Sequence, residues 1–238
     1  MKILILLLVF TVAGLPARGA AVFPGAIPDP ATFDPSEAVT PNVSQIFTDF
    51  PGFSSMSIDD LAVAATQRRI VNVTTLLRAQ GGFPSFQEVT GYQVSVFSDP
   101  AAAGAGLEGD IASVLLAPGA GVSVIPFAPA ISDEYGLVSL NLDILLPTAG
   151  TYWLGVAPVA ASTVAGQFFT HNSPSGIPAS PGNARFANPG GGFAVGPLTL
   201  IGAELAQEVV LIPEPAAGLL LIVAALAGFH RRRPVLPH

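Results

Sequence analysis

Alternation of apolar and polar residues is the feature of this chain that most restricts its fold. In residues 138–144, aliphatic side chains at the even positions alternate with Ser, Asn and Asp at the odd positions. Residues 92–96 and 151–156 show the same period of two, and a last strand punctuated by polar residues is predicted to end at Ile212. Because successive side chains of a β-strand point to opposite faces, this pattern predicts strands with one buried face.

Shorter segments rich in aliphatic and aromatic residues predict further strands between turns of Gly and Pro. They cover residues 58–64, 70–77, 122–125, 166–170, 184–187 and 198–201. Between the two termini no segment keeps the spacing of a helix; residues 101–116 allow a short helical turn but contain three glycines. The chain therefore predicts an all-β fold, an antiparallel β-sandwich of jelly-roll or immunoglobulin-like type. We place this domain at residues 52–212, after a Pro-rich extended leader at residues 22–51.

The N-terminus has the order of features that is typical of a secretory signal peptide. Lys2 supplies a positive charge, residues 3–12 form an almost unbroken apolar run, and small residues follow. Cleavage is expected after Gly19 or Ala21, so residues 1–21 are assigned to the signal peptide. The sequence therefore predicts export of the domain that follows.

The C-terminus combines a short apolar segment with a basic tail. Residues 216–229 contain no charged residue and would form a helix about 21 Å long, against about 30 Å for the hydrocarbon core of a membrane. The tail at residues 230–238 contains Arg231, Arg232 and Arg233, and such a cluster stops transfer and stays on the cytoplasmic side. Snorkelling arginines and local thinning of the bilayer compensate for a short span. We therefore predict a transmembrane helix at residues 216–229, with the β-domain outside.

The motif Pro213-Glu214-Pro215 stands directly before this apolar segment. The motif, the apolar helix and the arginine cluster, in that order, closely resemble the PEP-CTERM sorting signal of Gram-negative and related bacteria. The resemblance implies that an exosortase, a processing enzyme of the inner membrane, recognises residues 213–238 and passes the protein to the cell surface or extracellular matrix. It also implies exopolysaccharide as a partner, because such proteins accompany exopolysaccharide and biofilm genes.

Three fragments of the body look like parts of a β-sandwich that is often found on PEP-CTERM proteins. They are residues 58–61 (IDDL), 91–100 (GYQVSVFSDP) and 149–156 (AGTYWLGV), and they occur in the usual order. This second resemblance implies the same fold for the body, and it assigns no activity.

Charge and cysteine content exclude several classes of function. Residues 21–212 hold four arginines, no lysine and fifteen acidic residues, so their formal charge is −11. Binding to a phosphate backbone depends on Lys and Arg, and nucleic acid is therefore excluded as a partner. The chain has no cysteine, which excludes disulfides, thiolate metal sites and a cysteine nucleophile.

No group of residues predicts catalysis, a cofactor or a bound metal. The body has one histidine, His171, which we place in an exposed loop, and no G-x-S-x-G motif supplies a serine nucleophile. One histidine cannot form a zinc site. Carboxylates offer oxygen ligands for calcium, but Asp59 and Asp60 should point to opposite faces of a strand and would share an ion only across a bulge. The preferred interpretation is that the acidic residues lie in solvated turns; these are Asp59, Asp60, Asp99, Glu108, Asp110, Asp133 and Glu134.

The sequence therefore predicts an exported, non-enzymatic protein of the cell surface or extracellular matrix, with a structural or exopolysaccharide-associated role. One alternative is a carbohydrate-binding or carbohydrate-active protein on the same scaffold. Its binding surface would use aromatic side chains, although we expect Trp153 in the core; the candidates are Tyr152, Trp153, Phe168, Phe169, Phe186 and Phe193. A second alternative is an uncleaved bitopic membrane protein that keeps its C-terminal tail.

Overall fold

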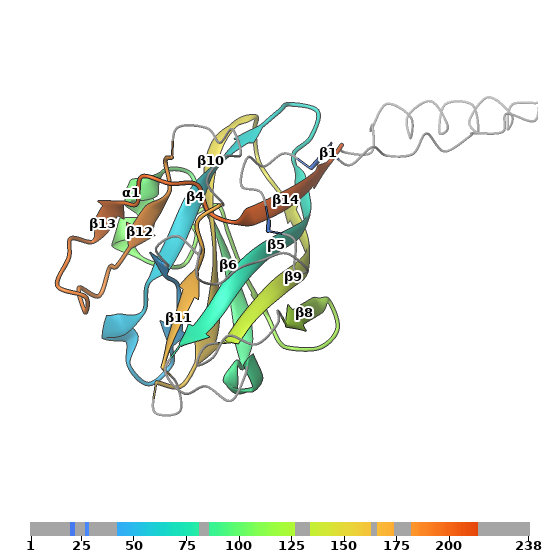
Figure 1. Cartoon of the computed structure of the whole chain (residues 1–238). Coiled ribbons are helices and arrows are strands. Elements are labelled where there is room, and N and C mark those ends of the chain that lie inside the picture. Colours follow the sequence, from blue (N-terminus) through green and yellow to red (C-terminus); the bar gives the residue numbers. More distant parts are fainter. Residues whose placement is uncertain are drawn as a thin grey trace, which may run out of the picture.

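The computed structural model describes residues 20–21, 27–28, 42–80, 86–126, 134–162, 166–173 and 182–213. Within them the fold is all-β, as the alternation in the sequence predicts (Figure 1). Two sheets face each other across a hydrophobic core, and nearly all of their strand pairs are antiparallel.

The first sheet is built around β5 (Arg69–Gln80), which pairs along one side with β9 (Glu134–Leu145). Along its other side, β5 pairs with β14 (Gln207–Ile212) over its first half and with β11 (Gln167–Thr170) over its last residues. Three shorter strands complete this sheet: β8 (Val122–Pro126) beside β9, β1 (Ala20–Ala21) beside β14, and β2 (Asn42–Val43) beside β11.

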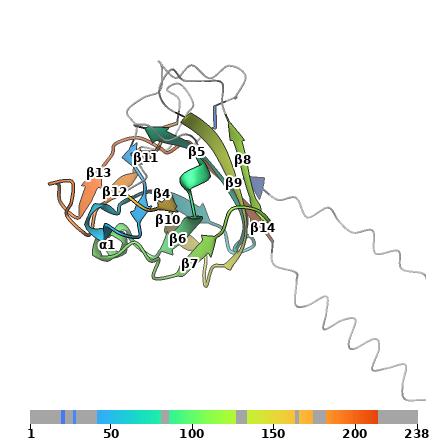
Figure 2. The same ribbon diagram turned by 90° about the horizontal axis from the view of Figure 1, so that it is seen from below.

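The second sheet has β10 (Gly150–Ala160) at its centre, between β4 (Met56–Val63) and β6 (Gly91–Phe97). Figure 2 shows these three strands on the side of the interior opposite β5 and β9. Four shorter strands complete the sheet: β7 (Ala112–Leu116) beside β6, β12 (Arg185–Ala187) beside β4, β13 (Leu198–Leu200) beside β12, and β3 (Ile46–Phe47), which pairs in parallel with the end of β10.

The predicted strands are all present, but residues 101–116 contain a strand as well as the short helical turn that the sequence allows. Their first part belongs to α1 (Pro100–Ala105), which starts where the Asp99 side chain accepts a hydrogen bond from Ala101 N at 2.6 Å. Their last part is β7, a strand that the sequence analysis missed because its outward residue Leu115 is apolar and 61% exposed. Two 3₁₀ turns, η2 (Pro51–Phe53) and η3 (Phe86–Glu88), are the other described helical elements.

The main core lies between the two sheets and explains the alternation in the sequence. Alternate residues of β9 and β10 enter it, among them the fully buried Val138, Leu140 and Leu154. A second, smaller cluster lies on the other face of β4 and β6, where Met56 and Phe97 pack with residues of α1 and β12. Full burial of one such side chain contributes about 1.5–3 kcal/mol. Packing of this kind, and not disulfides, holds the cysteine-free domain together.

The predicted terminal segments fall almost entirely outside the described residues. Of the predicted signal peptide, only Ala20 and Ala21 are described; they pair with Leu211 and Val210 of β14. Of the predicted sorting signal, only Pro213 is described, and it is exposed directly after β14. Within the described part of the chain, no helix is long and apolar enough to cross a membrane.

Candidate functional site

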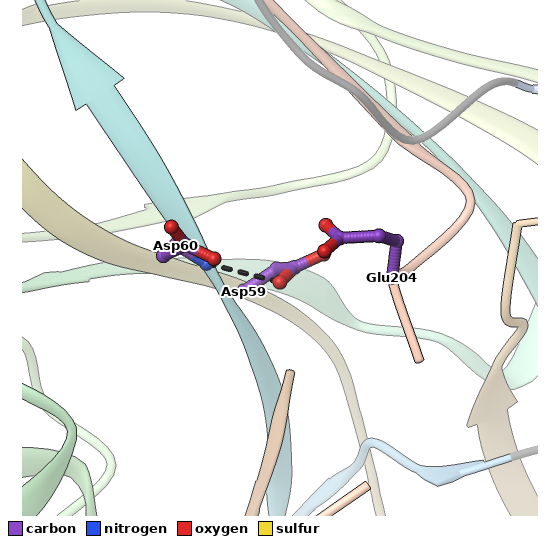
Figure 3. Close-up of side chains that lie close together, drawn as sticks. All are labelled: Asp59, Asp60 and Glu204. Carbon is purple, nitrogen blue, oxygen red and sulfur yellow. Dashed lines mark hydrogen bonds between the residues drawn. The ribbon is translucent and has the colours of Figure 1, made fainter. Parts of the chain in front are cut away.

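Three acidic side chains from distant parts of the sequence converge beside the middle of β4. Asp59 and Asp60 lie on β4, and Glu204 lies in the loop that leads into β14 (Figure 3). One carboxylate oxygen of each residue lies within 4.8 Å of the other two. Asp59 is completely buried, Glu204 is 3% exposed and Asp60 is half-buried. Among the described residues, this is the one group of three or more potential metal ligands that gathers so closely.

The geometry corrects one expectation from the sequence. Asp59 faces Leu154 and Asp60 faces Trp153 in the β4–β10 pairing, which runs without a bulge through both positions. The two Cβ atoms therefore do point to opposite faces of the sheet. A carboxylate oxygen lies two bonds beyond its Cβ atom, however, and can turn back toward the strand between the two faces. Adjacent aspartates on a regular strand thus reach a common point, which the sequence argument had excluded.

Asp59 fastens the loop before β14 to β4. Its Oδ2 atom accepts a hydrogen bond from Leu205 N at 2.8 Å, and its Oδ1 atom accepts one from Asp60 N at 3.0 Å. The carboxylate of Glu204 points at that of Asp59 (Figure 3). Both of its oxygens are buried, and neither accepts a well-formed hydrogen bond among the described residues. The same is true of Asp60 Oδ1. Against the effect of burial, weaker interactions with the Asp59 carboxyl group and the backbone of Asn183 lower the pKa of Glu204.

The loop that presents Glu204 is fixed by close backbone packing. A Cβ atom on Gly182 would lie 2.5 Å from Ala203 N, so only glycine allows this approach. Ala184 N donates to Ala203 O at 3.2 Å, and Gly202 has a φ of +77°, a conformation that favours glycine. On the other side of the loop, Ser173 N donates to Glu204 O at 2.8 Å. Glu204 is thus held in place from both flanks.

Burial dominates the electrostatics of the cluster. Desolvation raises the pKa of Asp59 to about 8, against the lowering effect of its hydrogen bond from Leu205, and the negative charge of Glu204 adds to the rise. Burial also raises the pKa of the Glu204 carboxyl group. Within the described residues, no arginine forms an ion pair with any of the three carboxylates. The cluster must therefore hold a proton or bind a cation from outside.

Arg185 is the arginine of the strand next to β4, and it is engaged elsewhere. Its guanidinium group donates to the carbonyl oxygens of Asn183 and Ala184. It also lies over the indole ring of Trp153, with Cζ 5.3 Å from the ring centre. This cation–π contact holds the guanidinium group over Trp153, on the face of the sheet that also bears the Cβ atom of Asp60, and no ion pair with Asp60 forms. The sequence analysis expects Trp153 in the core. The side chain is half-buried and packs against the second hydrophobic cluster.

The expectation of an exposed His171 is wrong, because this side chain is only 1% exposed. The residue sits between β5 and the loop before β14: its N–H donates to Leu76 O at 3.3 Å, and its carbonyl accepts from Ala206 N at 2.7 Å. Its ring packs against Tyr135 with the ring centres 5.3 Å apart. Burial, helped by the positive charge of Arg78, lowers the pKa of His171 to about 4.

The other acidic residues singled out in the sequence do not join the cluster. Asp99 caps α1, and Asp110 accepts hydrogen bonds from Ser98 N at 2.9 Å and Ser98 Oγ at 2.5 Å. Asp133 lies outside the described residues. Glu204 was not among the candidates, although its sequence context gave a signal: it is a single acid between apolar neighbours, in the run Ile-Gly-Ala-Glu-Leu-Ala.

The aromatic residues proposed for sugar binding separate into two groups. Tyr152, Phe168 and Phe169 are buried. Phe186 and Phe193 instead meet edge to face with ring centres 5.7 Å apart, next to two phenylalanines that the sequence analysis did not select. These are Phe53, at 5.4 Å from Phe193, and Phe50, which stacks on Phe53 at 4.9 Å and is 50% exposed.

Comparison with known proteins assigns no family to this architecture. No protein-family model matches the chain, and no curated protein matches it either. The proposals below therefore depend on the sequence pattern and on the geometry described above.

Proposed function

We propose that this chain is an exported, non-enzymatic protein that an exosortase sorts to the cell surface or extracellular matrix of a Gram-negative-type bacterium. One observation supports this most directly: β14, the last strand of the body, ends at Ile212, and the exposed Pro213 opens the Pro-Glu-Pro motif at the next residue. A processing enzyme that acts at the motif would meet the chain directly after β14, the last described strand. It would not have to unfold a strand.

The strand order favours the immunoglobulin-like form of the sandwich over the jelly roll. In the immunoglobulin fold one sheet has the order A-B-E-D and the other the order C′-C-F-G. The order β14-β5-β9-β8 corresponds to the first sheet, and β7-β6-β10-β4 corresponds to the second. In this assignment the first long strand, β4, takes the place of strand G, and the last strand, β14, takes the place of strand A.

A hydrogen bond at Tyr152 supports the same assignment. Tyr152 lies near the start of β10, the strand that corresponds to F, and its hydroxyl donates to Thr148 O at 3.0 Å in the corner that follows β9. Thr148 N donates to the same hydroxyl at 3.2 Å. Immunoglobulin-like domains have a tyrosine corner at this point of the fold, in which a tyrosine early in strand F binds the backbone a few residues upstream.

Sorting is tested by locating the protein in the native host with and without its exosortase. We expect the wild-type body at the cell surface or in the medium, and we expect it in the inner membrane when the exosortase gene is deleted. A variant with Pro213→Ala, Glu214→Ala and Pro215→Ala should stay in the inner membrane even with the exosortase present. The control variant Pro234→Ala, beyond the arginine cluster, should behave as the wild type does. Equal distribution in all four samples would contradict the proposal, and retention in the inner membrane in all of them would favour an uncleaved bitopic protein.

A carbohydrate-binding role is the second candidate, and the half-exposed Phe50 beside Phe53 and Phe193 is the observation that favours it. Exposed aromatic rings can stack on sugar rings, which are apolar on one face. The test is retention on exopolysaccharide purified from the native host. Phe50→Ala should weaken retention, whereas Leu145→Ala, at a residue that is 52% exposed on β9, should not. Equal retention of both variants and the wild type would remove this candidate.

A further inference from the structure

We propose that Asp59, Asp60 and Glu204 form a calcium site that ties the two sheets of the body together. The site is a property of the folded domain and does not depend on how the protein is sorted. It would take a divalent cation that prefers oxygen ligands, with a structural and not a catalytic purpose.

The carboxylate of Glu204 is the observation that points to a ligand. It is 3% exposed, it is aimed at Asp59, and neither of its oxygens accepts a well-formed hydrogen bond among the described residues (Figure 3). Only weaker interactions with the backbone of Asn183 and with the Asp59 carboxyl group reach it. A buried, ionised carboxylate with no partner is strongly destabilising. Since no arginine pairs with it in the described part of the chain, the missing positive charge has to come from a bound cation or a proton.

The distances fit calcium. Calcium binds oxygen at 2.3–2.6 Å, so two oxygens that share one ion lie at most about 5.2 Å apart. The three carboxylate oxygens lie within 4.8 Å of one another, inside that limit. Calcium also accepts irregular sets of six to eight oxygens, whereas magnesium requires a near-regular octahedron at about 2.0–2.1 Å. Asp60 is half-buried, so water could supply further oxygen ligands from this side of the site.

The position of the site gives the ion a mechanical role. Asp59 and Asp60 belong to β4 in the second sheet, and Glu204 leads into β14 in the first sheet. An ion bound to all three would therefore cross-link the sheets in a domain that has no disulfide. It would also fix the start of the strand whose end precedes the sorting motif. Calcium sites in extracellular modules have dissociation constants on the order of 10⁻⁴–10⁻³ M, which suits an exported protein.

The experiment uses the protein as purified from its native host, stripped with EDTA. Calcium at 10 mM should raise the Tm by several degrees, with one ion bound per chain and a weaker effect from magnesium. Glu204→Gln keeps the size of the side chain and removes its charge, so it should weaken calcium binding at least tenfold. Glu208→Gln, on the neighbouring β14, is the matched control and should keep the full shift. A Tm that does not respond to calcium, or an equal response in both variants, would overturn the site.

A second measurement on the wild-type protein covers the case in which Glu204→Gln does not fold. Trp153, the single tryptophan of the chain, pairs with Asp60 across β4 and β10 and can transfer excitation energy to a bound terbium ion. We expect tryptophan-sensitised terbium emission that saturates at one ion per chain and falls when calcium is added. Absence of sensitised emission would show that the carboxylates share a proton and bind no ion.

Discussion

The buried His171 makes the free energy of unfolding of this protein depend on pH. The surroundings of the imidazole ring determine how large this dependence is. Its ring is 1% exposed, packs against Tyr135 of β9 and feels the positive charge of Arg78 on β5. Both burial and Arg78 oppose protonation, so the folded protein keeps the imidazole neutral well below the pH at which the unfolded chain binds a proton.

The pKa of His171 falls from 6.5, the ordinary value for histidine, to about 4 in the folded protein. A lowered pKa favours the neutral form of the folded state, so this contribution to stability is complete above pH 6.5. This stabilisation is lost as the pH falls from 6.5 to 4, because over this range His171 binds a proton in the unfolded chain but stays neutral in the folded protein. At about 1.4 kcal/mol per pH unit, a difference of about 2.5 units amounts to about 3 kcal/mol.

Urea unfolding of the wild type and His171→Gln between pH 7.5 and pH 4 measures this quantity. Glutamine keeps a polar side chain of similar size but does not titrate. Carboxylates titrate in both proteins and cancel in the difference between them. We expect that difference in the free energy of unfolding to shift by about 3 kcal/mol against the wild type as the pH is lowered. A difference that stays constant over this range would show that the folded protein does not hold His171 neutral, whatever the stability of the variant at neutral pH.

Three further predictions concern the fold, and urea unfolding at pH 7 measures each of them. Tyr152→Phe removes the hydroxyl that binds the corner after β9 and should cost about 1 kcal/mol; no loss would argue against the tyrosine corner. Gly155→Ala would place a Cβ atom 2.7 Å from a backbone oxygen of β4 and should cost about 1–3 kcal/mol. Gly106→Ala, where no atom lies within 4 Å, is its control and should cost far less. Asp99→Ala removes the cap of α1 and should cost about 1 kcal/mol; an unchanged stability would contradict the capping role.

Strands such as β9 were predictable from the sequence because one face lies in the core and the other is open to solvent. Val138, Leu140 and Ile144 of β9 are buried, whereas Asn141 and Asp143 between them are exposed. The alternation of apolar and polar residues in β9 therefore matches the alternation of buried and exposed side chains. The edge strand β7 lacks this signal, because its outward residue Leu115 is apolar and breaks the alternation.

The carboxylate cluster was not predictable, because it depends on a contact between β4 and a loop far along the chain. The sequence shows that Asp59 and Asp60 are adjacent, but it does not show that Gly182 lets the loop of Glu204 approach them. His171 was misplaced for a similar reason. Its polar neighbours in the sequence indicate a loop. In the structure its backbone is hydrogen-bonded to β5 and to the loop before β14, and its ring packs against Tyr135 of β9.

Processing of this chain by an exosortase at its C-terminus would change its mass, so the decisive measurement is the intact mass of the protein from its native host. The mass should be compared between a strain with the exosortase and a strain without it. We expect the residues beyond the Pro213-Glu214-Pro215 region to be missing only when the enzyme is present. A protein that keeps its arginine cluster in both strains would contradict the proposal and would identify the C-terminal segment as a simple membrane anchor.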